Sequence, residues 1–65
     1  MRRKIEIEPE GPRWVHVHDE HRSKRFDRHG DAEAWAVARA RSLGGAELVV
    51  RNAVGEVERR RIVEP

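Results

Sequence analysis

The sequence predicts an α+β fold, one antiparallel sheet with a single helix packed on one of its faces. Two observations carry this prediction: apolar and polar residues alternate in short segments on both sides of the chain's midpoint, and an alanine-rich stretch between them ends at two glycines. A length of 65 residues leaves room for one domain, residues 1–65. The expected order along the chain is β-β-β-α-β-β.

The helix is expected over residues 31–43. Asp31 is the predicted N-cap, because its carboxylate can accept hydrogen bonds from the free amides of the first turn. Gly44 and Gly45 are expected to end the helix, since glycine adopts the left-handed conformation without a steric penalty.

The helical period predicts which face of this helix packs on the sheet. At 3.6 residues per turn, that face holds Ala34, Trp35, Ala38 and Ser42, with Val37 and Leu43 beside it. Trp35 is the bulkiest of these side chains, so we expect it to anchor the helix in the core. The alternative is an exposed platform for stacking nucleic-acid bases, which we consider less favoured.

Three strands are expected before the helix. Residues 3–8 alternate, with Ile5 and Ile7 on one side. The prolines of residues 9–12 predict a turn that ends this strand. Residues 13–18 also alternate, but Trp14, His16 and His18 share one face and Val15 and Val17 the other, so the pattern leaves open which face is buried. Residues 22–26 form a short third strand that contains Phe26.

Two strands are expected after the helix, at residues 46–51 and 56–63, joined by a type I turn over residues 52–55. Val57 and Val63 share parity with Arg59 and Arg61, whereas Ile62 falls on the other face. A β-bulge, or a sheet that is apolar on both sides, would explain this slip. The predicted core consists of Trp14, Trp35, Phe26, Val15 or Val17, Leu48, Val50 and Val57.

Composition excludes several function classes. The chain contains no cysteine, which rules out disulfides, thiolate metal sites and cysteine nucleophiles. Its charged residues make up 40% of the sequence, yet the net charge is only +2, a balance typical of a solvated surface. No apolar run is long enough to span a membrane, and we expect a cytoplasmic protein. Neither a recognisable catalytic motif nor a glycine-rich phosphate loop is present, so we expect no enzyme activity, cofactor or small-molecule substrate.

A family resemblance rests on several of these segments. The matching pieces are Trp14, residues 31–35 (DAEAW), Ala38-Arg39, residues 45–50 (GAELVV) and Gly55. With these pieces the chain resembles the small bacterial and phage proteins of domain-of-unknown-function family 2188. The family usually has W-x-V where this chain has histidine at position 16. The resemblance implies a compact module of sheet and helix, and it brings no established activity and no catalytic residues.

Histidines cluster in the segment HVHDEH. His16 and His18 point to the same side of a strand, and His21 can fold back across the turn, with Asp19 or Glu20 nearby. Three imidazole or carboxylate ligands are a workable set for zinc or nickel. The alternative, which we favour, is a polar stripe on an exposed strand face, and so we predict no metal.

Basic residues suggest a second type of site. Arg22 and Lys24 share a face of the third strand, and Arg59, Arg60 and Arg61 lie on the last. If these two strands share a surface, their cations can contact phosphates. The remaining members of the basic set are Arg2, Arg3, Lys4, Arg25 and Arg28. The alternative is that the cations pair with glutamates or protect an edge strand from aggregation.

Two functions follow from these features. The first is a non-enzymatic module that associates with nucleic acid without sequence preference, through Arg22, Lys24, Arg59, Arg60 and Arg61. The second is a homodimeric protein-interaction module with no affinity for nucleic acid, which a sheet apolar on both faces would favour. The distribution of the arginines distinguishes them: cations gathered on one open surface favour nucleic acid, and cations interleaved with glutamates favour self-association.

Overall fold

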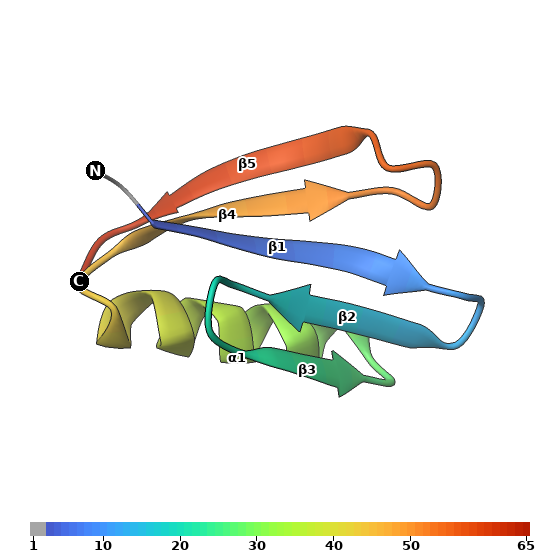
Figure 1. Cartoon of the computed structure of the whole chain (residues 1–65), viewed down its shortest axis with the longest axis horizontal. Helices are drawn as coiled ribbons and strands as arrows, with labels where there is room; N and C mark the ends of the chain where they lie inside the picture. The colour runs from blue at the N-terminus through green and yellow to red at the C-terminus, as the bar shows by residue number, and fades with distance from the viewer. Residues whose placement is uncertain (1–2) are drawn as a thin grey trace.

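The computed structural model describes residues 3–65, which form five strands and one helix (Figure 1). The elements are β1 (Arg3–Glu10), β2 (Trp14–His18), β3 (Ser23–Phe26), α1 (His29–Ser42), β4 (Ala46–Arg51) and β5 (Val57–Val63). Within this part of the chain, no helix is both long and apolar enough to cross a membrane.

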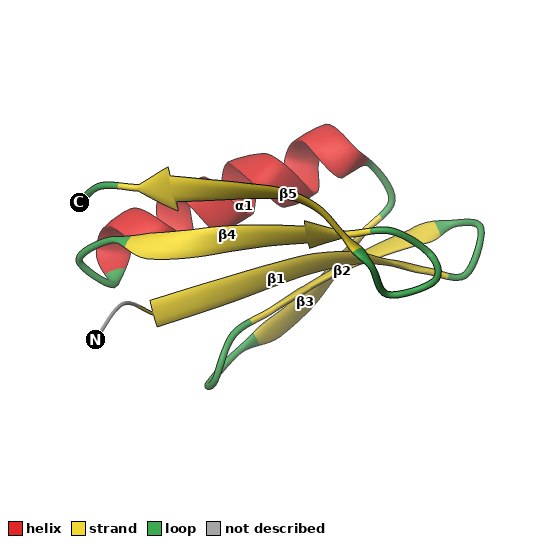
Figure 2. Ribbon diagram, turned by 90° about the horizontal axis from the view of Figure 1, so that it is seen from above, coloured by secondary structure: helices red, strands yellow, loops and turns green. Residues whose placement is uncertain are grey.

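The strands form one sheet in the order β3-β2-β1-β4-β5, and α1 lies along one face of it (Figures 1 and 2). The predicted α+β class and element order are confirmed. The sheet is mixed rather than wholly antiparallel, because β4 runs parallel to β1. β2 and β3 already occupy one side of β1, so the chain returning from α1 adds β4 on the other side, in the direction of β1.

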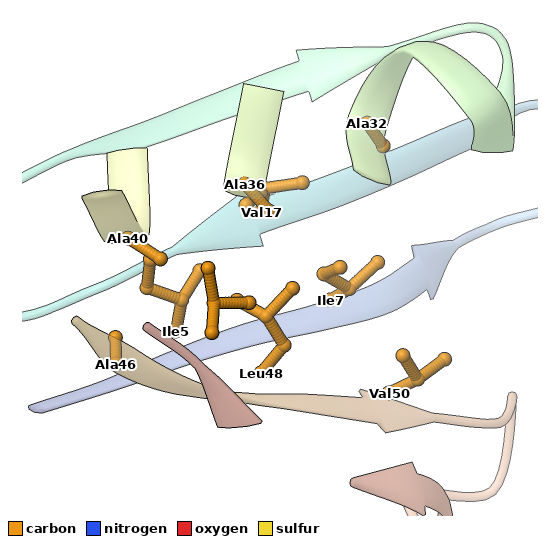
Figure 3. Packing of buried hydrophobic residues seen from close by; sticks show 10 residues of the cluster. Ile5, Ile7, Val17, Ala32, Ala36, Ala40, Ala46, Leu48 and Val50 are labelled. Carbon is orange, nitrogen blue, oxygen red and sulfur yellow. The ribbon is translucent and has the colours of Figure 1, made fainter. Parts of the chain in front are cut away.

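The core lies between the sheet and the helix (Figure 3). It is built from the alternating residues that the sheet turns toward α1 and from the alanines that the helix turns toward the sheet: Ile5, Ile7, Val17, Ala32, Ala36, Ala40, Ala46, Leu48, Val50 and Val63. The two isoleucines of β1 are fully buried, as expected for the central strand. Leu48 and Val50 of the predicted core are also buried.

The buried face of the helix differs from the predicted one. Ala32, Ala36 and Ala40 are fully buried, whereas the predicted members Ala34, Ala38 and Ser42 are exposed. Alanine occupies every second position here, so the sequence offers small residues to more than one face. Trp35 and Phe26 are partly buried against the core, with ring centroids 6.0 Å apart. Trp35 therefore packs beside the alanine stripe, which is the part of α1 that meets the sheet directly.

The prediction for the start of the helix is wrong, and the prediction for its end is confirmed. Asp31 is not the N-cap: α1 begins at His29, its N-cap residue Arg28 makes no side-chain capping bond, and Asp31 lies within the first turn. The glycine stop is confirmed. The amide of Gly45 donates to the carbonyl of Ala40 at 2.8 Å and that of Gly44 to Arg41 at 3.0 Å, and both glycines have positive φ. These paired bonds form a Schellman motif.

The open question of β2 is resolved in favour of the valines. Val17 is buried and pairs with Ile7 on the helix side, so His16, His18 and Trp14 lie on the opposite face. Trp14 is 39% exposed, and its predicted place in the core is wrong. Its large ring stays partly exposed because no element among residues 3–65 covers that face.

The first turn also falls later than expected. β1 continues through Pro9 to Glu10, and the turn occupies residues 11–13. Pro9 pairs with Val15 of β2 but lies beyond Ile7, the last residue of β1 that pairs with β4. The strand has a neighbour on only one side at that point, and such edge positions are where a sheet tolerates proline.

The C-terminal hairpin contains the bulge that the slipped alternation suggested. The register shifts between Val50 and Arg51, which pair with Arg59 and Val57. Val57 is consequently placed opposite Arg51 and is exposed, so its predicted place in the core is wrong. The amide of Gly55 donates to the Asn52 carbonyl at 3.0 Å, which closes the predicted turn.

Candidate functional site on the open face of the sheet

The face of the sheet opposite α1 is the candidate site, and we call it the open face. No element among residues 3–65 lies across it (Figure 2). The strand register assigns to this face the residues Lys4, Glu6, Glu8 and Glu10 of β1, Trp14, His16 and His18 of β2, Ser23 and Arg25 of β3, Glu47, Val49 and Arg51 of β4, and Val57, Arg60 and Ile62 of β5.

A row of three glutamates runs along the central strand of this face, because the alternation that buries Ile5 and Ile7 turns Glu6, Glu8 and Glu10 outward. The outer two are each held by an arginine. Arg51 donates to Oε1 of Glu6 through Nε at 3.0 Å and through Nη2 at 2.9 Å. Nε of Arg25 lies 2.7 Å from Oε1 of Glu10.

The middle glutamate faces two histidines instead. Nε2 of His18 lies 3.1 Å from Oε1 of Glu8, and Nδ1 of His16 lies 4.0 Å from the same oxygen. The two imidazole rings are stacked, with centroids 4.9 Å apart and planes at 22°. All three side chains are about one-third exposed. One ligand atom from each residue lies within 4.8 Å of the other two, so Glu8, His16 and His18 form a three-residue group that we call the His₂Glu cluster.

Charge on the open face is balanced. Four cations, Lys4, Arg25, Arg51 and Arg60, accompany four carboxylates, Glu6, Glu8, Glu10 and Glu47. The carboxylates occupy the centre, and arginines lie on the strands to either side. A phosphate backbone approaching this face would meet the glutamate row as well as the arginines, and the two contributions to the potential largely cancel.

Apolar side chains lie on the β4–β5 half of the same face. Val49 is only 1% exposed although no element covers it, because Glu6 and Arg60 flank it and their long side chains shield it. Ile62 is 43% exposed and Val57 is 37% exposed. Apart from Trp14 on β2, the apolar side chains of the open face therefore lie in this half.

The residues predicted to contact nucleic acid do not share a surface. β3 and β5 are the two opposite edges of the sheet, which places these two strands about 19 Å apart across four strand spacings. Lys24, Arg59 and Arg61 lie on the helix side, at opposite edges, and Arg22 lies in the turn before β3.

Several of the predicted cations have other partners. Arg59 forms an ion pair with Glu33 of the helix, and the ammonium group of Lys24 lies 5.4 Å from the centroid of the Phe26 ring. Arg60 and Arg61 have no carboxylate partner among residues 3–65. Arg2 of the basic set lies outside the described residues.

The structure brings together two of the three histidines considered as metal ligands. His21 lies in the β2–β3 turn, is 69% exposed and has Glu20 as its nearest carboxylate at 3.9 Å. It does not join His16 and His18. Glu8 takes its place, from a neighbouring strand. Two features of the sequence could have identified Glu8. The alternation of IEIE places Glu8 on the face opposite the isoleucines, and an antiparallel pairing of residues 3–8 with residues 13–18 places it directly opposite His16.

Asp19, one of the two carboxylates of HVHDEH considered as ligands, has a structural role. Its Oδ1 accepts hydrogen bonds from the amides of His21 and Arg22 at 2.8 and 2.9 Å, and its Oδ2 accepts one from Nε of Arg39 at 2.8 Å. Burial alone would raise the pKa of this carboxyl, but the bond from Arg39 and the two amide bonds outweigh it and lower the pKa to about 2. Asp19 is therefore charged at neutral pH and supports the turn beside the cluster.

Comparison with known proteins returns no match among family models, curated proteins or solved structures. Membership of domain-of-unknown-function family 2188 stays a prediction from the sequence.

Proposed function

We propose that this chain is a non-enzymatic protein-interaction module that forms homodimers through its open face. The observation that carries the proposal is the pattern on that face, where a central glutamate row lies between flanking arginines and exposed apolar residues lie to one side. The cytoplasmic location expected from the sequence belongs to the same proposal.

This pattern is self-complementary. In a two-fold dimer each partner presents the same surface, so a copy shifted by one or two strands places its arginines against the glutamate row of the other. Ile62 and Val57 supply the apolar area that becomes buried in such a contact. A 65-residue chain also has a small core, which burial at an interface supplements.

The test is the dependence of assembly and stability on concentration. A homodimer melts at a temperature that rises with protein concentration, and sedimentation equilibrium gives its dissociation constant directly. We expect Ile62→Glu to weaken association at least tenfold, because it places a buried charge in the interface. Val54→Glu is the matched control, since Val54 is 77% exposed in the turn and lies off the open face.

A melting temperature that stays constant over a hundredfold dilution, together with a monomer in sedimentation, would reject the proposal. Equal weakening by Ile62→Glu and Val54→Glu would reject the open face as the contact surface.

Association with nucleic acid is the second candidate, favoured by one specific observation. Arg60 and Arg61 on the edge strand β5 have no carboxylate partner among the described residues, so both guanidinium groups can reach phosphates. Titration with random-sequence DNA and RNA, followed by tryptophan fluorescence at low and physiological salt, tests it. The candidate requires binding that weakens steeply with salt, and a smaller salt dependence when Arg59, Arg60 and Arg61 are replaced by alanine. No binding at low salt would eliminate it.

A further inference from the structure

We propose that the His₂Glu cluster on the open face binds a divalent transition-metal ion of the zinc class, with Glu8, His16 and His18 as its three protein ligands. All three ligands come from one chain, so the site can form in the monomer. It lies on the same open face as the proposed dimer contact, so a bound metal ion and a partner's arginine would compete for Glu8.

The distances within the cluster suit a metal ion. Zinc binds imidazole nitrogen and carboxylate oxygen at about 2.0–2.2 Å, so neighbouring ligand atoms in a tetrahedral site lie roughly 3.3–3.5 Å apart. The two histidine–glutamate separations of 3.1 and 4.0 Å bracket this range. Small rotations of side chains that are about one-third exposed bring all three atoms onto one ion, and the same exposure leaves an entry path and a fourth position for water.

The surrounding ion pairs select Glu8 as the carboxylate ligand. Glu6 and Glu10 also lie near the histidines, at 3.6 Å from Nε2 of His18 and 3.9 Å from Nδ1 of His16. Each of them, however, is bound by an arginine, Arg51 or Arg25. Among the described residues Glu8 has no lysine or arginine partner, and its carboxylate is directed at the two imidazoles alone.

The backbone supports this arrangement. His16 and His18 are two residues apart on β2, so they project from the same face. Glu8 is the direct neighbour of His16 in the antiparallel ladder between β1 and β2. Three ligands from two paired strands are held without any loop, which limits the conformational entropy lost when an ion binds.

The chemistry of the donors specifies the class of ion. Two imidazole nitrogens and one carboxylate oxygen suit zinc, nickel or copper, whereas magnesium and calcium prefer oxygen ligands alone. In the metal-free cluster a proton on Nε2 of His18 makes the contact with Glu8. For a metal ion to bind at Nε2, that proton moves to Nδ1, so the ring stays neutral and the hydrogen bond to Glu8 is exchanged for a metal–nitrogen bond.

Isothermal titration of the full chain with zinc chloride tests the site, with magnesium chloride as the ion control. We expect one zinc ion per chain and no heat from magnesium. His16→Ala, His18→Ala and Glu8→Gln are each expected to weaken zinc binding at least tenfold. His21→Ala and His29→Ala are the matched controls, because each removes one histidine elsewhere on the surface, and both are expected to retain the affinity of the original chain.

A second measurement separates loss of the site from loss of the fold. Thermal unfolding without metal is expected to be similar for all five variants, and zinc is expected to raise the melting temperature of the original chain and of the two controls only. The proposal is overturned by an absence of zinc binding at millimolar concentration, by equal affinity in the His16→Ala or His18→Ala variant, or by loss of binding in either control.

Discussion

Asp19 and Arg39 join the β2–β3 turn to the last turn of the helix through a bond of 2.8 Å between Nε and Oδ2. The Asp19 side chain is only 5% exposed and that of Arg39 is 15% exposed. A carboxylate at this depth is stable as an ion because three donors surround it, one guanidinium and two amides of its own turn. The contact therefore fixes a loop that the short strand β3 alone holds weakly.

Replacing Asp19 is expected to destabilise the fold in a pH-dependent way. A pKa lowered from 3.8 to about 2 corresponds to about 2 kcal/mol of stability at neutral pH. Because the folded-state pKa is the lower one, this contribution is complete above the unfolded-state value and disappears as the pH falls from about 4 toward 2. Urea unfolding of Asp19→Asn at pH 7 should show the full loss, and the difference from the original chain should shrink in acid.

Glu20→Gln is the control for that experiment, because the Glu20 side chain is next to Asp19 in the sequence and is 80% exposed. This substitution should change the free energy of unfolding by less than about 0.5 kcal/mol. A loss in Asp19→Asn that is the same at pH 7 and pH 2 would show that the charge of Asp19 is not the source of the stability.

The alanine stripe of the helix leads to a second prediction. Ala36 is fully buried against the sheet, whereas Ala38 is exposed two residues later. Ala36→Leu should cost about 1–3 kcal/mol because the close packing of α1 leaves no room for the added atoms. Ala38→Leu should leave the free energy of unfolding within about 0.5 kcal/mol of its original value. Chemical denaturation measures both losses. A larger loss for Ala38→Leu than for Ala36→Leu would support the helix face that the sequence predicted.

That helix illustrates where sequence reasoning failed. The existence of α1 and its glycine stop followed from local chemistry, namely alanine propensity and the positive φ of two glycines. The orientation of the helix did not, because alanines at every second position satisfy several faces at once. The size of Trp35 predicted that it anchors the helix in the core, but the close approach of a helix to a sheet favours residues with no atoms beyond Cβ.

The strands show a similar division. The clean alternation of residues 3–8 correctly placed Ile5 and Ile7 on one side of a strand, but the predicted core left out both of these fully buried residues. Trp14-Val15-His16-Val17 offered two large faces and no basis for a choice. The parallel pairing of β1 with β4 is a non-local property, since no turn connects these strands. It determines which residues of β4 share the open face with β1, and so Arg51 could be assigned to this face only once the topology was known.

The two kinds of isoleucine give a third prediction. Ile5 is fully buried in the central strand, and Ile62 is 43% exposed at the edge. Ile5→Ala should reduce the free energy of unfolding by about 2–5 kcal/mol through lost apolar contact and a residual cavity. Ile62→Ala should cost less than about 1 kcal/mol in the monomer. Denaturation at low protein concentration distinguishes the two, and comparable losses would contradict the assignment of Ile62 to the open face.

The glycines give the last prediction. Gly45 has a φ of +106°, and a Cβ atom built on it would lie 3.2 Å from the Val63 carbonyl oxygen and 3.3 Å from Cδ of Pro65. Gly45→Ala combines backbone strain with this crowding, so it should cost more than about 1 kcal/mol. Gly30 lies in the first turn of α1 with nothing within 4 Å of the same position, and Gly30→Ala should add about 0.5 kcal/mol.

Both glycine variants add one methyl group near an end of the same helix, so the opposite signs of their effects separate conformational strain from helix propensity. Thermal unfolding of the two variants at one protein concentration measures the difference. Stabilisation by Gly45→Ala would mean that the Schellman motif is not needed to direct the chain from α1 into β4, and that the contact with Val63 can relax without cost.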